Sequence, residues 1–204
     1  MRKLLLTYFL LLCAGGYIHG REEDLPGLTY GVEWGYMPAL YSAHHYNFFD
    51  PYNYFRVYGR DAGMTYCTNA EVNMHIGYNL NRYWNLSFRA GYAGAAEFTP
   101  VIPLTLRATR LLGDNHLIDR WFTFGEIGSG IIIKERPEEI WTVKAGGGYR
   151  VSLSRNTKMD FIAAIRFLYM HPEIIHYDAP LLSEYINRND GYVGSLFLGI
   201  SLTF

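Results

Sequence analysis

A hydroxyl and two imidazoles lie close together in the stretch SAHHYNF, residues 42–48, and these groups could support nucleophilic catalysis. Ser42 stands three residues before His45, with His44 between them. An imidazole activates a serine hydroxyl only when the two lie within hydrogen-bond distance, and spacing alone does not establish that. We therefore predict no catalytic residues, and we keep a Ser–His pair as the alternative.

Two further histidines, His171 and His176, fall with His44 and His45 in segments that we predict to be loops. Four imidazoles could bind a metal ion, but these four show no defined ligand spacing. Exposed or stacked histidines are the simpler interpretation. We predict neither a metal site nor a cofactor.

Aromatic residues are unusually dense directly after the histidine pair. Aromatic side chains supply contact area at a low entropic cost, so such density often marks a recognition surface. The predicted binding residues are Tyr46, Phe48, Phe49, Tyr52 and Tyr54. The same residues could instead continue the flanking strands and pack against the rest of the protein.

The elements that position these residues are strands, because apolar residues recur at every second position along most of the chain. In the last segment, for example, Leu202 and Phe204 share one face, while Ser201 and Thr203 share the other. Eight such segments are predicted, over residues 28–40, 71–80, 86–92, 101–112, 121–133, 141–153, 160–169 and 192–204.

The connections between these segments alternate between two classes. Residues 81–84, 113–119 and 154–157 form compact polar turns, whereas residues 43–69, 95–100, 134–139 and 171–190 are predicted loops that include the longest gaps. About ten tilted residues at roughly 3.3 Å each cross a hydrocarbon layer of about 25 Å. The pattern therefore predicts an all-β fold, a membrane-spanning up-and-down antiparallel β-barrel of eight strands with both termini on the short-turn side.

The chain ends on Phe204, with apolar residues at every second position before it. This ending resembles the carboxy-terminal insertion signal of bacterial outer-membrane proteins, and the whole exported chain resembles a small OmpA/OmpX-type outer-membrane β-barrel domain. The resemblance implies this fold, a location in the bacterial outer membrane, contact with outer-membrane lipid, and insertion by the barrel assembly machinery. Function does not follow from the fold.

The polar face of the predicted strands is rich in Gly, Ser, Thr and Asn, with single charges between them. A soluble lipocalin-like barrel, with this face outward, is the alternative, but a soluble surface would carry more Lys and Glu. The polar face is therefore predicted to line a narrow interior, where balanced charges can pair. The charges on it are Glu33, Glu71, Glu126 and Asp160, with Arg89, Arg107, Lys144, Arg150 and Arg166.

The first 20 residues read as a secretory signal peptide, with a basic start, an apolar run and small residues after it. Cleavage after Gly16 or after Gly20 is predicted, which leaves residues 21–204 as the barrel domain. Cys13 could indicate a lipoprotein signal instead, but Leu12 occupies the place of the expected small residue. Cys67 is then the only cysteine of the exported chain, so no internal disulfide is predicted.

The formal net charge of −1 favours no nucleic-acid partner. We therefore predict a structural, surface-binding or adhesion protein of the cell envelope, porin-like in architecture, with an extracellular ligand or host surface as the expected partner. The alternative is a lipid-modifying enzyme, because residues 42–48 loosely resemble the His-Tyr-Ser-Asn stretch of lipid A deacylases. In this chain Asn47 follows Tyr46 directly, so the serine of that stretch is missing.

Overall fold

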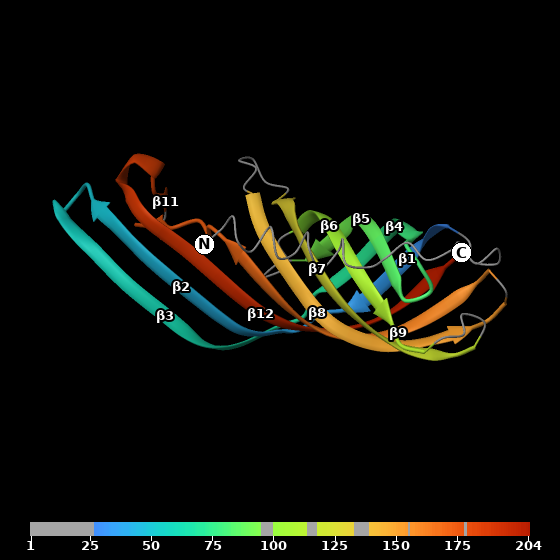
Figure 1. Ribbon diagram of the computed structural model, residues 1–204. Helices are drawn as coiled ribbons and strands as arrows, with labels where there is room; N and C mark the ends of the chain where they lie inside the picture. Colours follow the sequence, from blue (N-terminus) through green and yellow to red (C-terminus); the bar gives the residue numbers. More distant parts are fainter. Residues whose placement is uncertain (1–26, 95–99, 114–117, 133–138, 155, 178) are drawn as a thin grey trace, which may run out of the picture.

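A computed structural model describes residues 27–94, 100–113, 118–132, 139–154, 156–177 and 179–204 (Figure 1). The predicted signal peptide lies outside these residues. Eight antiparallel strands form a closed barrel in the order β1-β4-β5-β6-β7-β8-β9-β12, which confirms the predicted fold. Their bounds are β1 Leu28–Tyr36, β4 Ala70–Asn79, β5 Trp84–Gly94, β6 Pro100–Leu111, β7 Arg120–Ile132, β8 Glu139–Ser152, β9 Lys158–Met170 and β12 Ile186–Thr203.

The barrel closes where the first strand meets the last. The register of β1 against β12 runs from Gly31 opposite Thr203 to Tyr36 opposite Leu198. Beyond the ladder, the backbones of Tyr30 and Phe204 exchange two further hydrogen bonds, at 2.7 and 3.1 Å. Both ends of the described chain therefore lie on the side of the short turns, as predicted.

One β-hairpin extends beyond the end of this barrel (Figure 1). It consists of β2, Ala39–Asp50, and β3, Phe55–Cys67. Strand β2 takes over from β1 as the partner of β12, and β3 pairs with β2. Pro38, which has no backbone N–H to donate, marks the change from β1 to β2, while its carbonyl accepts a hydrogen bond from the Leu196 amide at 3.0 Å.

The prediction of a loop over residues 43–69 was therefore wrong, because most of that segment is strand. The predicted first strand, residues 28–40, also merges two elements, because β1 ends at Tyr36 and β2 begins at Ala39. Aromatic and polar residues occur on both faces of β2, so the apolar–polar alternation that marks a membrane-spanning strand is lost there. We refer below to β2, β3 and the turn between them, residues 39–67, as the outer hairpin.

The second long connection, residues 171–185, contains three short elements. Strands β10, Ile175–His176, and β11, Ala179–Pro180, form a small hairpin, and the 3-10 helix η2, Ser183–Tyr185, leads into β12. Strand β12 begins at Ile186, so it extends six residues further outward than predicted. No helix among the described residues is long and apolar enough to cross a bilayer.

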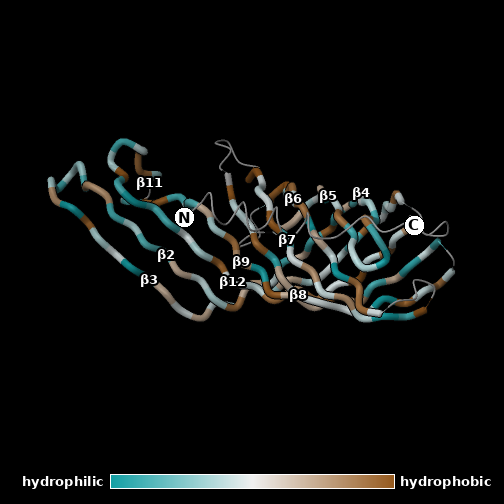
Figure 2. Tube along the Cα trace, in the orientation of Figure 1, coloured by the Kyte–Doolittle hydropathy of each residue, from teal (hydrophilic) through white to brown (hydrophobic). Residues whose placement is uncertain are grey.

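Apolar side chains face outward around the barrel, and polar ones face inward. On β4, Val72, Met74 and Ile76 are exposed, whereas Asn73 and His75 between them are buried. Figure 2 shows apolar and polar positions alternating along the barrel strands. This direction is the reverse of that in a soluble barrel, so the lipocalin-like alternative is excluded.

The lumen is packed with side chains. One apolar cluster, which includes Val101, Ile132 and Ile140, fills the end from which the long connections leave. A second, which includes Phe122, Phe124 and Phe197, lies deeper. Gly35 and Gly199 flank the Phe197 ring so closely that a Cβ on either would lie within 2.6 Å of it, so glycine makes room for this ring.

Candidate functional site

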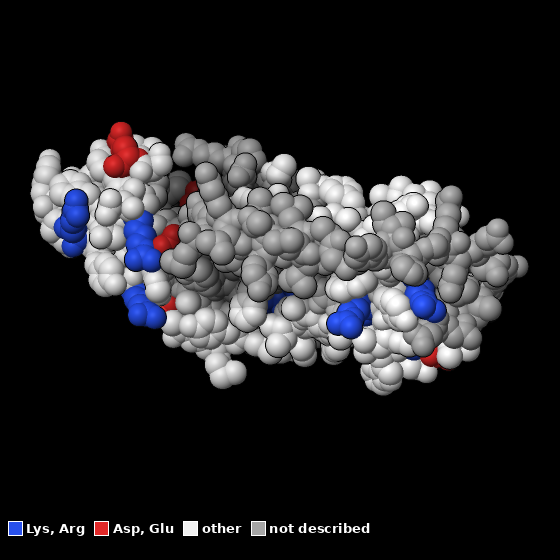
Figure 3. All heavy atoms as spheres, in the orientation of Figure 1, with Lys and Arg blue, Asp and Glu red and all other residues white. Residues whose placement is uncertain are grey.

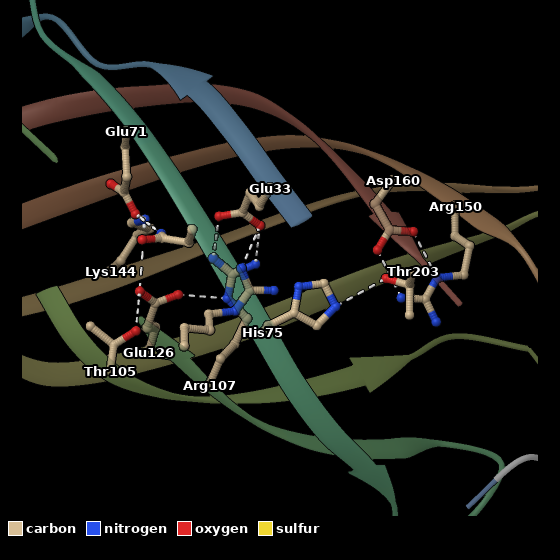
Figure 4. Close-up of polar contacts among 12 residues, drawn as sticks. Glu33, Glu71, His75, Thr105, Arg107, Glu126, Lys144, Arg150, Asp160 and Thr203 are labelled. Atoms are coloured by element: carbon tan, nitrogen blue, oxygen red, sulfur yellow. Dashed lines mark hydrogen bonds and ion pairs between the residues drawn. The ribbon is translucent and has the colours of Figure 1, made fainter. Parts of the chain in front are cut away.

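The predicted interior charges do form a paired network inside the barrel (Figure 4). Arg107 is its centre: Nη1 and Nη2 donate to the two carboxylate oxygens of Glu33 at 2.8 and 2.9 Å, and Nε donates to Glu126 at 2.6 Å. Arg89 also contacts Glu33, at 2.8 Å. The guanidinium of Arg107 additionally lies 4.0 Å from the centre of the Phe124 ring. One buried cation therefore stabilises two carboxylates, one on the neighbouring strand β7 and one on the non-adjacent strand β1.

Lys144 extends the network from β8. Its Nζ lies 2.6 Å from Glu71 and 3.7 Å from Glu126, and 4.2 Å from the centre of the Phe197 ring. The Thr105 hydroxyl donates to Glu126 at 2.9 Å. Each buried carboxylate of the network thus has at least one cation and one hydrogen bond, which lowers the cost of burying it.

Arg150 and Asp160 form a separate pair, with two hydrogen bonds of 2.7 and 2.8 Å. Asp160 is therefore the acid that depends on Arg150, while Glu126 belongs to the Arg107 network. Arg166 is buried and donates to the Thr142 hydroxyl at 3.0 Å. These contacts fill the lumen, so the charged residues serve to hold the barrel together.

The outer hairpin carries the predicted binding residues, in three different settings. Phe48 is only 4% exposed and packs edge-on against the His176 ring, with 5.0 Å between centroids. Tyr46 lies across Gly59 of β3. Tyr52 and Tyr54, at the tip, are 69% and 80% exposed. Phe49 contacts Tyr54 edge-on, with their centroids 6.4 Å apart. The tip therefore exposes aromatic surface, whereas the Phe48 ring is buried against His176 and is not accessible to a ligand.

Asp50 shapes the tip of the hairpin. Its carboxylate accepts hydrogen bonds from the backbone amides of Tyr52 and Asn53 at 2.8 and 3.2 Å, and from the Asn53 side chain at 2.8 Å. Burial opposes ionisation, but these hydrogen bonds outweigh it and lower the pKa of Asp50 to about 2. His176 Nε2 lies 3.1 Å from the same carboxylate. This contact ties the tip to the connection of residues 171–185.

A second tie joins the tip to the same connection. The Asn53 side chain donates to the Tyr177 hydroxyl at 2.8 Å, and the Tyr52 and Tyr177 rings meet edge-on at 5.6 Å. Tyr54 itself has φ of +58°, a left-handed conformation that bulky residues rarely adopt. The outer hairpin is therefore a braced structure with a fixed turn at its end.

The candidate pair Ser42 and His45 does not come together. Ser42 lies opposite Val193 of β12, which points into the lumen, whereas His45 lies opposite Asp190 and contacts the outward-facing Tyr192. The two side chains therefore point to opposite faces of β2. His44 shares the face of Ser42, but its Nε2 is hydrogen-bonded to Asn189 at 2.8 Å.

The four histidines near the outer end have separate partners. His44 contacts Tyr46, His45 contacts Tyr192, His171 contacts Tyr169, and His176 contacts Phe48, each ring against ring. Within the described ranges, no group of three or more His, Cys, Asp or Glu side chains could hold a metal ion. The His44 ring is tilted against its partner, and the other three rings meet theirs edge-on.

The sequence did not predict a polar cluster formed by Tyr169, Arg188 and Asp190. Asp190 of β12 accepts hydrogen bonds from the Tyr169 hydroxyl at 2.8 Å and from Arg188 Nε at 2.6 Å. The short spacing of Arg188 and Asp190, two residues apart on one strand face, is a signal that was available. Residues 171–190 are predicted as a loop, in which two residues at this spacing share no defined face.

Comparison with solved structures identifies the architecture. The outer-membrane protein OprG of Pseudomonas aeruginosa aligns with a TM-score of 0.54 and 11% identity, over 87% of this chain and 96% of OprG. Neisserial surface protein A gives a TM-score of 0.44 and 11% identity, over 88% and 100% of the two chains. The Escherichia coli outer-membrane protease OmpT gives 0.39 and 7%, over 87% and 97%.

The chain has the fold of a small outer-membrane β-barrel. Its belt of exposed apolar residues places it in the bacterial outer membrane, because a closed barrel leaves no backbone group unpaired in lipid. No protein-family model matches the chain, and no curated protein sequence matches it either. At such low identity the similarity establishes the fold and no shared activity.

Proposed function

We propose that this barrel is a non-enzymatic anchor that presents the outer hairpin to an extracellular ligand or host surface. The observation that carries the proposal is the exposed aromatic tip on a braced support. Tyr52, Tyr54 and Tyr58 are all at least 69% exposed, and β2 is paired along most of its length to β12 of the barrel. Rigid aromatic side chains on a fixed scaffold bind at a low entropic cost.

The filled lumen also supports a barrel that serves as an anchor and an outer hairpin that performs recognition. Buried ion pairs and two apolar clusters occupy the interior of the barrel, so the interior offers little space for a substrate path. Ser42 and His45 point to opposite faces of β2, and His44 Nε2 is hydrogen-bonded to Asn189, so neither histidine contact favours the lipid A deacylase alternative. Recognition is then left to the part of the chain outside the barrel.

The test is a hairpin replacement designed on the observed register. Tyr46 lies opposite Gly59, so residues 47–58 can be replaced by an Asn-Gly turn that reconnects this pair. Bacteria displaying this variant should lose adhesion to a cultured epithelial monolayer. A triple substitution, Tyr52→Ser, Tyr54→Asn and Tyr58→Ser, should reduce adhesion while leaving the hairpin backbone intact.

The control is Tyr83→Ser, which removes a tyrosine from the short turn at the opposite end of the barrel. Each variant must retain the gel shift between unheated and heated samples, which reports a folded barrel. Unchanged adhesion of both hairpin variants would overturn the proposal. If His45→Ala alone altered the acyl chains of lipid A in mass spectra, the enzymatic alternative would replace it.

A further inference from the structure

A row of aromatic side chains marks the outer membrane interface on one side of the barrel. Trp141 of β8 lies opposite Tyr169 of β9, and Tyr169 lies opposite Tyr192 of β12. Trp141 and Tyr192 are exposed on the outward face. Aromatic residues of this kind sit at the level of the lipid headgroups, so the row fixes where the hydrocarbon layer ends.

Basic residues follow on the same outward face, further from the membrane. One step beyond Tyr192, the residues Asp190, His45 and Arg60 lie opposite one another on β12, β2 and β3. One step further, Arg188 lies opposite Asn47. Two residues of a strand span roughly 7 Å, and less along the membrane normal when the strand is tilted. Along the strand the row of Arg60 therefore lies roughly 7 Å beyond Tyr192, and Arg188, four residues beyond Tyr192, roughly 14 Å, so both lie on the headgroup side of the aromatic row.

The charges on this face leave a surplus of cations. Asp190 is the acid among these residues, and it already accepts hydrogen bonds from Arg188 and Tyr169. That contact holds the Arg188 guanidinium while its remaining N–H groups stay available. Arg60 is exposed and has no ion-pair partner among the residues that the structure describes. Basic side chains reach the surface over the hairpin and the adjoining part of β12 (Figure 3).

We propose that Arg60 and Arg188 bind the phosphate groups of lipid in the outer leaflet of the membrane. Arginine presents a planar set of donors that matches phosphate oxygens. The position of the two residues directly beyond the aromatic row makes membrane lipid the occupant, since this face continues the lipid-facing wall of the barrel. The bound lipid would also seat the outer hairpin at a fixed angle to the membrane.

The proposal can be tested by native mass spectrometry of the full protein in detergent with added lipid A that carries two phosphates. The wild type should retain bound lipid A. The double variant Arg60→Gln, Arg188→Gln should bind about tenfold more weakly, because charge-assisted hydrogen bonds are lost. Lipid A with a single phosphate should bind the wild type less tightly, and inorganic phosphate in excess should compete only weakly.

The matched control is Arg110→Gln. Arg110 is also exposed, faces outward and lies beside an aromatic residue, Trp84, but at the opposite rim. This variant should bind lipid A as the wild type does. Because Arg188 also holds Asp190, the single variant Arg60→Gln provides a second measurement in which no described contact is lost. Equal lipid A binding by the double variant and the wild type, or an equal loss in Arg110→Gln, would overturn the proposal.

Discussion

At the scale of single residues, the lumen of this barrel shows how buried charges can be tolerated. Arg107 contacts Glu33, which is 74 residues away in the sequence, and Glu126, which is 19 residues away. The sequence predicted which residues point inward, because side-chain direction on a strand alternates strictly. It did not predict the pairs. The contact of Arg107 with Glu126 depends on the register of the neighbouring strands β6 and β7, and the contact with Glu33 depends on which strands face each other across the lumen.

Replacing Arg107 with Met should leave two buried carboxylates without the cation that they contact. We expect the free energy of unfolding to fall by about 3–5 kcal/mol, the usual effect of removing one partner of a buried ion pair. Denaturant titration of the refolded protein in detergent measures this value. Arg110→Met, at an exposed position, serves as the control, and adding Glu33→Gln to the Arg107 variant should recover part of the loss. An unchanged unfolding free energy would contradict a structural role for the network.

At the scale of elements, the outer hairpin was the main departure from the sequence-based prediction. Strand β2 reads as loop because His44, Tyr46 and Phe48 on one face and His45 and Phe49 on the other give no contrast between faces. Beyond the hydrocarbon layer neither face of the hairpin meets acyl chains, so nothing selects an apolar side. The aromatic density was still a correct guide to an unusual segment, and a binding role for it stays a prediction.

The turn of this hairpin should respond to acid. The pKa of Asp50 is lowered from its ordinary value of 3.8 to about 2, so the stability it contributes is complete above about pH 4 and is lost as the pH falls towards 2. The amide NMR signals of Tyr52 and Asn53 should therefore shift with a midpoint near 2. In Asp50→Asn this transition should be absent. A midpoint near 4 would show that the carboxylate is not held as described.

The closing strand should determine insertion into the membrane. Phe204 stacks on Tyr30 with 5.8 Å between centroids, on the outward side of the seam. Phe204→Asp would place a charge at the interface, so folded protein in the outer-membrane fraction should decrease severalfold. Thr203→Ser, whose side chain points into the lumen beside His75, should assemble as the wild type does. Equal assembly of the Phe204 variant would contradict the register of this strand.

At the scale of the whole molecule, alternation along eight strands was enough to predict a closed outer-membrane barrel with both ends at one rim. The same alternation could not predict how fully the lumen is packed. Phe122 and Phe124, on the face of Glu126, disturbed the expected pattern of a polar interior; in the structure they form part of an inner apolar cluster. Packing of this kind depends on the diameter of the closed barrel, which a single strand does not encode.

The central claim is that the barrel is a filled anchor and that recognition is performed outside it. The most direct measurement is the conductance of purified protein reconstituted into planar lipid bilayers, together with a porin as a positive control. We predict no sustained porin-sized conductance, because ion pairs and apolar clusters occupy the lumen. A stable, porin-sized open channel formed by the wild-type protein would contradict the account.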